Sequence, residues 1–115
     1  MSTFFGFAVA ANMFPVNAII RKVALTPEEV REMLEEGGVQ SCLNPSHAAT
    51  IAAAKQRFGI EVEIPDKAPR VTLGIGDAVI VMAVQGLARL EGRHEYTDKE
   101  IEGADFAFSI FEVLE

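Results

Sequence analysis

Cysteine is almost absent from this chain: Cys42 is the only one among 115 residues. A single cysteine excludes an internal disulfide and fits a reducing compartment, so we expect a cytoplasmic protein. Histidine is nearly as scarce, and neither of its two residues has a spacing to Cys42 typical of a zinc site. The sequence therefore predicts no metal site and no cofactor.

Long hydrophobic runs are also missing. No apolar run reaches the roughly 18 residues that a membrane-spanning helix requires, so we expect no membrane partner. The apolar stretch at residues 4–13 has no basic residue before it, and Pro15 follows it closely. We therefore interpret this stretch as a buried strand and not as a signal peptide.

Positive charge is in short supply, with 10 Lys and Arg against 17 Asp and Glu and a net charge of −7. This excess counts against duplex DNA or RNA as a partner, because such binding depends on neutralising many phosphates. It is compatible with a small anionic ligand in a local pocket. The apolar half of the composition is typical of a globular chain, and the length predicts one domain, residues 1–115.

The pattern of apolar and capping residues predicts an α/β fold: a mixed sheet of about five to six strands, two main helices and a short third helix. Thr26, Pro27 and Glu29 open the first helix with a capping box, and Thr97 opens the short third helix in the same way. The second main helix is expected from about Ser46 to Phe58. The candidate strands are residues 1–9, 16–25, 39–43, 60–64, 70–73, 78–84 and 105–114, with 70–73 and 78–84 paired as a hairpin.

Residues 44–50 place His47 in the predicted first turn of the second helix, just after a short apolar strand. A helix N-terminus offers unpaired N–H groups and a partial positive charge, so it can hold a phosphate. A histidine there can pass a proton to the leaving oxygen of a phosphodiester. In the alternative interpretation, Asn44 or Ser46 simply caps the helix and His47 is an ordinary surface residue. The local pattern alone favours this alternative.

Several segments, in their order along the chain, are similar to one family. They are residues 4–14 with Asn12-Met13, Ser46-His47-Ala48-Ala49-Thr50, the Arg70 to Val81 region with Gly76-Asp77, Leu90-Glu91-Gly92 with the following Thr97-Asp98-Lys99-Glu100-Ile101, and the last strand. Together they resemble the small ring nucleases that archaeal viruses, phages and mobile elements carry as anti-CRISPR proteins. The resemblance spans nearly the whole chain and depends on the ordered set of segments.

The resemblance implies a homodimer whose two subunits enclose cyclic tetra-adenylate, the second messenger of type III CRISPR immunity. It implies metal-independent cleavage, in which a ribose 2′-OH attacks the adjacent phosphorus and leaves a 2′,3′-cyclic phosphate. By the same match, His47 is the general acid and Glu91 an auxiliary polar residue. The ligand-binding residues that it implies are Asn12, Ser46, Ala48, Thr50 and Arg70.

The sequence departs from the family pattern in three ways. Ala88 stands where the family has an arginine three residues before the matching glutamate, and Arg89 is one step further on. One step along a strand reverses the side chain's face, so Arg89 can replace that arginine only where the backbone is looped or bulged. Phe7 stands where the family has an asparagine, and Ser46 and Ala49 replace the glycine and serine around the histidine. The departures leave open a non-catalytic protein that sequesters a cyclic nucleotide or binds another protein of the host.

Other polar residues have a structural interpretation beside a functional one. Arg70 is consistent with a phosphate contact and with a solvated strand position, and its place before the predicted Gly-Asp hairpin slightly favours the phosphate contact. Asn12 and Asp77 fit turns better than chemistry. Lys55 and Arg57 are expected on the polar face of the second helix, and His94 in a polar surface loop.

Overall fold

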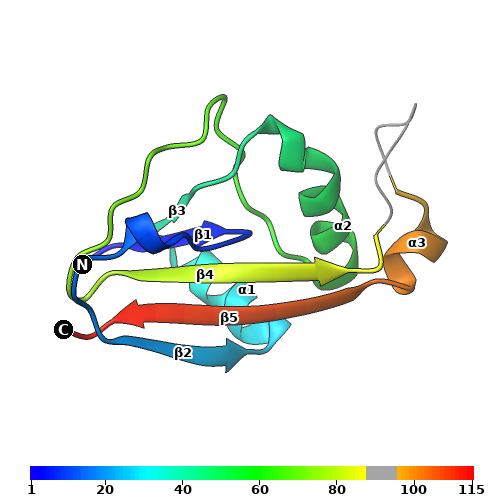
Figure 1. Cartoon of the computed structure of the whole chain (residues 1–115). Helices are drawn as coiled ribbons and strands as arrows, with labels where there is room; N and C mark the ends of the chain where they lie inside the picture. The colour runs from blue at the N-terminus through cyan, green and yellow to red at the C-terminus, as the bar shows by residue number, and fades with distance from the viewer. Residues whose placement is uncertain (88–95) are drawn as a thin grey trace.

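The computed structural model describes residues 1–87 and 96–115 (Figure 1). The predicted site residues Arg89 and Glu91, together with Ala88 and His94, lie outside the described residues. The strands are β1 (Thr3–Gly6), β2 (Ile20–Leu25), β3 (Val39–Ser41), β4 (Ala78–Gln85) and β5 (Asp105–Val113). The helices are α1 (Pro27–Glu36), α2 (Ala48–Phe58) and α3 (Asp98–Glu102), with 3-10 turns η1 (Ala11–Met13) and η2 (Pro45–His47).

The described strands form one mixed sheet in the order β2-β5-β4-β1-β3. β1 runs parallel to both of its neighbours, β3 and β4, while β5 runs antiparallel to β4 and β2. The apolar run of the first strand predicted a place inside the sheet, and this is confirmed because β1 has a partner on each side. The predicted α/β class, with two main helices and a short third one, is confirmed as well.

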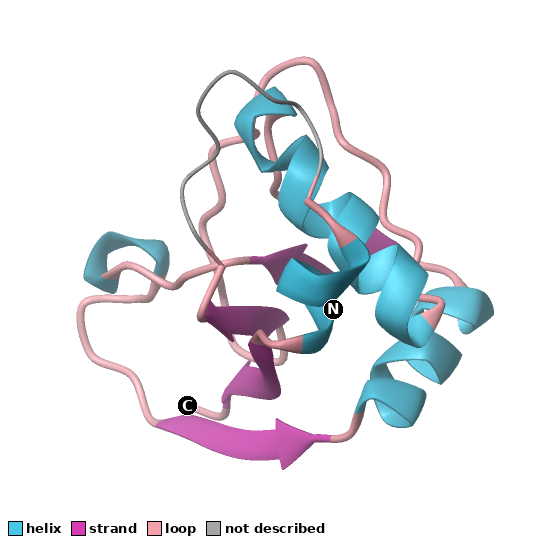
Figure 2. Cartoon of the chain, turned by 90° about the vertical axis from the view of Figure 1, so that its right-hand side faces the viewer, coloured by secondary structure: helices cyan, strands magenta, loops and turns pink. Residues whose placement is uncertain are grey.

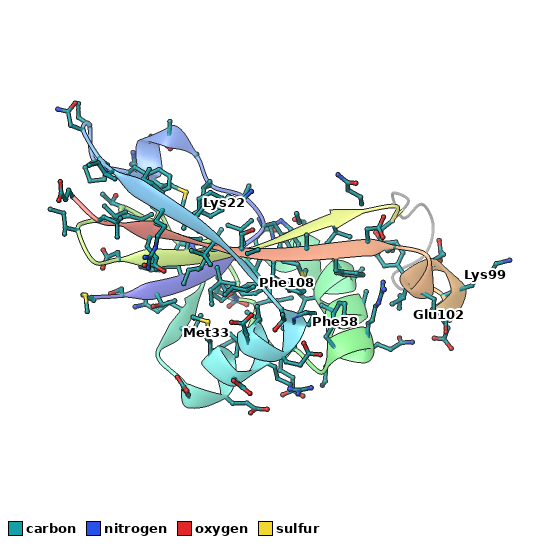
Figure 3. The ribbon with its side chains drawn as sticks, turned by 90° about the horizontal axis from the view of Figure 1, so that it is seen from below. Lys22, Met33, Phe58, Lys99, Glu102 and Phe108 are labelled. Atoms are coloured by element: carbon teal, nitrogen blue, oxygen red, sulfur yellow. The ribbon has the colours of Figure 1, made fainter. Side chains whose placement is uncertain are left out.

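Helices α1 and α2 cover one face of the sheet (Figure 2). Figure 3 shows Met33 and Phe58 on this side of the sheet together with Phe108 of β5. The Phe58 ring meets the Phe108 ring edge-on, with centroids 5.7 Å apart. Small residues in α2, with Ala53 and Ala54 buried, allow this helix to approach the strands closely. The helical face therefore holds the larger core cluster.

Chain segments without regular strand structure cover part of the opposite face. Leu73 is buried there with Val79 of β4 and Val113 of β5, and Met13 and Phe14 pack against them. The backbone N–H of Leu73 donates a 2.6 Å hydrogen bond to the carbonyl of Met13. This contact fixes the chain after Arg70 against the turn that contains Asn12.

The predicted hairpin between residues 70–73 and 78–84 is wrong. Both edges of β4 are already taken by β1 and β5, so residues 70–73 cannot pair with it. The predicted edge strand at 60–64 is also wrong, because residues 59–77 contain no helix or strand. The alternating apolar residues of this segment nevertheless face the protein interior. Ile60 is fully buried, and Val62 and Ile64 pack against the core.

The turn at residues 74–77 is confirmed, and Asp77 holds it. The Asp77 carboxylate accepts hydrogen bonds from the backbone N–H groups of Gly74 (2.9 Å) and Ser2 (2.8 Å). These two donors lower the pKa of Asp77 because they stabilise its charged form. Asp77 therefore ties the N-terminus to the start of β4.

The capping predictions are confirmed at both boxes. The Thr26 hydroxyl accepts from the backbone N–H of Glu29, and the Thr97 hydroxyl accepts from that of Glu100. The expected second helix begins instead with η2, and regular α-helix starts at Ala48. No helix in the described part of the chain is long and apolar enough to cross a membrane.

Candidate functional site

Asn44 organises the segment around His47. Its side-chain oxygen accepts hydrogen bonds from the Ser46 backbone N–H (2.9 Å) and from the Ser46 hydroxyl. Its own backbone N–H donates to Nδ1 of His47 at 3.2 Å. Asn44 thus caps the turn, as one interpretation of the sequence expected, and also orients the imidazole.

The backbone N–H groups at this helix start already have acceptors. The amide of Ser46 bonds the Asn44 side chain, that of His47 bonds the Asn44 carbonyl at 2.9 Å, and that of Ala48 bonds the Pro45 carbonyl. A phosphate at these three amides would have to displace the acceptors. Side chains are therefore the more accessible anion contacts near His47.

The hydrogen bond from Asn44 defines the tautomer of neutral His47. Because Nδ1 accepts, the proton is carried by Nε2, which remains available as a donor. The Phe7 ring lies against the imidazole with centroids 4.5 Å apart and planes tilted by 58°. Partial burial lowers the pKa of His47 below its usual value of 6.5, so the imidazole is mainly neutral at pH 7 without a ligand.

A pocket of about 410 Å³ lies on the surface beside His47. We call it the Arg70 pocket; Asn12, His47 and Arg70 line it, and Cys42 and Phe7 contribute further wall. No acidic group in the described part of the chain forms a salt bridge with Arg70, whose guanidinium is exposed. The hydrogen bond between Leu73 and Met13 explains why Arg70 and Asn12, far apart in sequence, meet here.

A second pocket of about 420 Å³ also reaches His47. We call it the Tyr96 pocket; its lining among the described residues is Phe7, His47, Thr50, Met82, Ala83, Val84, Leu87 and Tyr96. Phe7 and His47 line both pockets, so the pair lies where they meet. The two pockets differ in chemistry, because one has a guanidinium in its wall, whereas the described lining of the other has no charged side chain and includes the Phe7 and Tyr96 rings.

The predicted site residues are distributed unevenly over this geometry. The Arg70 pocket brings together Asn12, His47 and Arg70, while Thr50 lies in the Tyr96 pocket. Ser46 lines neither pocket, since its backbone and hydroxyl are engaged with Asn44. Ala48 borders a different depression, near Lys55 and Glu61. The described part of the chain holds no group of three or more His, Cys, Asp or Glu that could bind a metal ion.

Sequence reasoning did not single out Cys42 or Tyr96 as site residues. Cys42 follows β3 and lines the Arg70 pocket, where burial raises the pKa of its thiol, so the thiol stays protonated at neutral pH. Tyr96 reaches its pocket from the chain just before α3. Neither position carries a local motif, and only the tertiary fold places them beside His47.

Comparison with known proteins gives a structural relative only. No protein-family model and no curated protein sequence matches the chain. Among solved structures, the chain is similar to B116 of Sulfolobus turreted icosahedral virus, with a TM-score of 0.73 and 20% sequence identity. The alignment covers 97% of this chain and 99% of that one. The chain therefore has a fold that also occurs in a viral protein.

Proposed function

We propose that this chain is a metal-independent phosphodiesterase that degrades cyclic tetra-adenylate and so blocks type III CRISPR signalling. One observation carries the proposal: His47, oriented by Asn44, lines a pocket together with Asn12 and with Arg70, which forms no salt bridge with any described acidic residue. A proton donor and a fixed cation in one pocket are what the cleavage of a phosphodiester requires. The likeness of the fold to a viral protein and the resemblance in sequence to anti-CRISPR ring nucleases support it.

In the proposed reaction, the ribose 2′-hydroxyl releases its proton to water and its oxygen forms a bond to the adjacent phosphorus while the bond from phosphorus to the 5′-oxygen breaks. His47 acts as the imidazolium: protonation of Nδ1 breaks the hydrogen bond from Asn44, and the ring then donates its Nε2 proton to the departing 5′-oxygen. The product end is a 2′,3′-cyclic phosphate. The Arg70 guanidinium pairs with the non-bridging phosphate oxygens. Burial lowers the pKa of His47, and a bound phosphate opposes that shift, so ligand binding favours the protonated acid.

This chemistry uses alignment of the 2′-OH, one acid and local anion stabilisation. We propose Glu91 as an auxiliary polar residue and Arg89 as a second cation, although both lie outside the described residues. The effect of Arg89→Ala separates two cases. A large loss of cleavage means that Arg89 replaces the arginine missing at Ala88, and no effect means that this chain works without that group.

We propose that the active form is a homodimer enclosing the cyclic ligand. β2 is an edge strand with one partner in the described sheet, and Ile19, Ile20 and Val23 are exposed on or beside it. A second subunit would cover such apolar surface, which lies at the sheet edge opposite β3 and therefore supports dimer formation only. That the dimer encloses the ligand is what the resemblance to ring nucleases implies. Light scattering at micromolar concentration tests this proposal, and a mass of one subunit throughout would contradict a shared ligand site.

The proposed activity is tested by incubating the purified protein with labelled cyclic tetra-adenylate, with and without EDTA. We expect linear products ending in a 2′,3′-cyclic phosphate at the same rate in both samples. Cleavage that EDTA abolishes would contradict the metal-independent mechanism. A complete absence of products would contradict an enzymatic function.

A second candidate is a protein that binds the cyclic nucleotide without cleaving it. Two observations favour it: the amides at the helix start are already occupied, and the apolar Phe7 lies against the catalytic candidate His47. This candidate predicts tight binding of cyclic tetra-adenylate with no turnover. It also predicts that His47→Ala changes neither property.

A further inference from the structure

The described lining of the Tyr96 pocket contains no residue with a formal charge at neutral pH. None of its described lining residues is Asp, Glu, Lys or Arg, and its titratable groups are His47 and Tyr96. Its volume of about 420 Å³ is within the roughly 300–1,000 Å³ common for small-molecule sites. Among these described residues a phosphate meets no cation, whereas an uncharged planar group meets two aromatic rings and aliphatic side chains.

We propose that the Tyr96 pocket is a nucleobase subsite, which takes the base next to the phosphate held in the Arg70 pocket. The inference rests on the proposed function, because it assigns a part of the same ligand to each pocket. Bases stack favourably on aromatic side chains, and such stacking depends little on charge. Tyr96 and Phe7 supply rings, and Met82, Val84 and Leu87 supply apolar contact.

The position of Phe7 supports this division of the ligand. Its ring lies 4.5 Å from the imidazole of His47, and the two side chains line both pockets. A base in the Tyr96 pocket and a phosphate in the Arg70 pocket would therefore lie on either side of the proton donor. The apolar Phe7 ring can stack on a base but cannot form a side-chain hydrogen bond to the ligand.

Among the described polar side chains of the pocket, His47 and Tyr96 can titrate and Thr50 cannot. Its hydroxyl can donate one hydrogen bond and accept others, so it can contact the edge of a base. Thr50 comes from α2 only three positions after His47, and both side chains are therefore placed by the same helix start. The subsite thus has rings for stacking and one adaptable polar group.

The chain offers an internal reporter for this pocket, because Tyr96 is its only tyrosine and it has no tryptophan. Tyrosine fluorescence therefore reports on this pocket alone. We expect adenosine 5′-monophosphate to quench the emission saturably, and ribose 5-phosphate at the same concentration to leave it unchanged. N-acetyltyrosinamide with the same nucleotide corrects for light absorbed by adenine.

Substitutions at Tyr96 provide the matched test by calorimetry. Tyr96→Ser should weaken binding of adenosine 5′-monophosphate by roughly tenfold, the usual value of one stacked base, and leave ribose 5-phosphate unaffected. Tyr96→Phe should keep the affinity because it keeps the ring. Tyr96→Leu keeps an apolar side chain but removes the ring, so it should weaken nucleotide binding as Tyr96→Ser does. It replaces the serine variant if that variant does not fold.

Absence of saturable quenching at millimolar nucleotide would overturn the inference, as would unchanged affinity in both the serine and leucine variants. The outcome is independent of the proposed activity. If wild type cleaves cyclic tetra-adenylate and adenosine 5′-monophosphate does not quench Tyr96, the proposed base subsite is wrong and the proposed enzymatic activity is supported. If the nucleotide quenches Tyr96 and no cleavage occurs, the base subsite is supported and the proposed enzymatic activity is wrong.

Discussion

The backbone N–H of Asn44 lies 3.2 Å from Nδ1 of His47 and donates a hydrogen bond to it. The same residue accepts the Ser46 amide with its side chain, so one asparagine both closes the helix start and selects the imidazole tautomer. Because Nδ1 is occupied, any proton that His47 gives to a ligand comes from Nε2. The geometry of two adjacent pockets thus depends on one short turn.

The first prediction concerns the titration of His47. Its pKa in the free protein should lie below 6.5, and a bound phosphate compound should raise it. Histidine resonances followed by NMR across the range around pH 6.5 measure both values, and His47→Asn assigns the signal. A pKa above 6.5 in the free protein would contradict the described burial of this side chain.

The same shift has a consequence for stability. Since the folded pKa is lowered, the unfolded chain binds more protons between the folded pKa and 6.5. Stability should therefore rise with pH through this window and fall as the pH drops below 6.5. Urea unfolding of wild type and His47→Asn should show a shallower pH dependence in the variant.

The second prediction concerns Arg70. Arg70→Ala should weaken binding of cyclic tetra-adenylate by roughly tenfold to a hundredfold, the usual value of a charged hydrogen bond to phosphate. The loss should shrink at high salt. Arg31→Ala is the matched control, because Arg31 lies on α1 and lines neither pocket. Equal effects of the two variants in calorimetry would argue against a phosphate contact at Arg70.

The third prediction compares two cations on α2. Arg57 donates to the backbone carbonyls of Ile101 (3.1 Å) and Ala104, and its guanidinium lies 5.5 Å from the Phe106 ring centroid. Arg57→Leu should lower the free energy of unfolding by about 1–2 kcal/mol. Lys55→Leu should cost at most about 0.5 kcal/mol, because its ion pair with Glu61 is 63% and 72% exposed. Urea unfolding of both variants measures these free energies. Equal losses in the two variants would mean that Arg57 does not anchor α2 to the α3 segment.

The fourth prediction concerns Asp77. Asp77→Asn should lower the melting temperature at neutral pH, because the carboxylate accepts from Ser2 and Gly74. A lowered folded pKa gives stability that is present above the unfolded pKa and is lost as the pH falls through the folded value. The difference between wild type and variant should therefore shrink in acid. Asp66→Asn is the matched control, because Asp66 is exposed and lies outside this turn.

Features that depend on local chemistry could be predicted from the sequence. Capping boxes specify their helices through hydrogen bonds within four residues, so α1 and α3 were expected where they occur. The predicted hairpin between residues 70–73 and 78–84 was wrong because a strand also needs a free partner, and both edges of β4 are taken. Which strands pair, and which strand edges stay free, depends on the whole sheet, so a local sequence pattern does not predict it.

The candidate site was predictable only in part for a similar reason. His47 could be identified from its place after a strand and before a helix. The meeting of Asn12 with Arg70 depends on the hydrogen bond between Leu73 and Met13, which joins segments 60 residues apart. The anchoring role of Arg57 likewise depends on carbonyls of α3 and the turn after it, which no local pattern reveals.

The most direct test of the account is cleavage and binding of labelled cyclic tetra-adenylate by wild type and His47→Ala, measured on the same preparations. The account predicts that the variant loses roughly 10²–10⁴-fold in cleavage rate, the usual value of a positioned general acid. Its affinity should fall much less, since Arg70 remains to hold the phosphate. Tight binding by both proteins with no cleavage by either would contradict the account and leave a protein that sequesters its ligand.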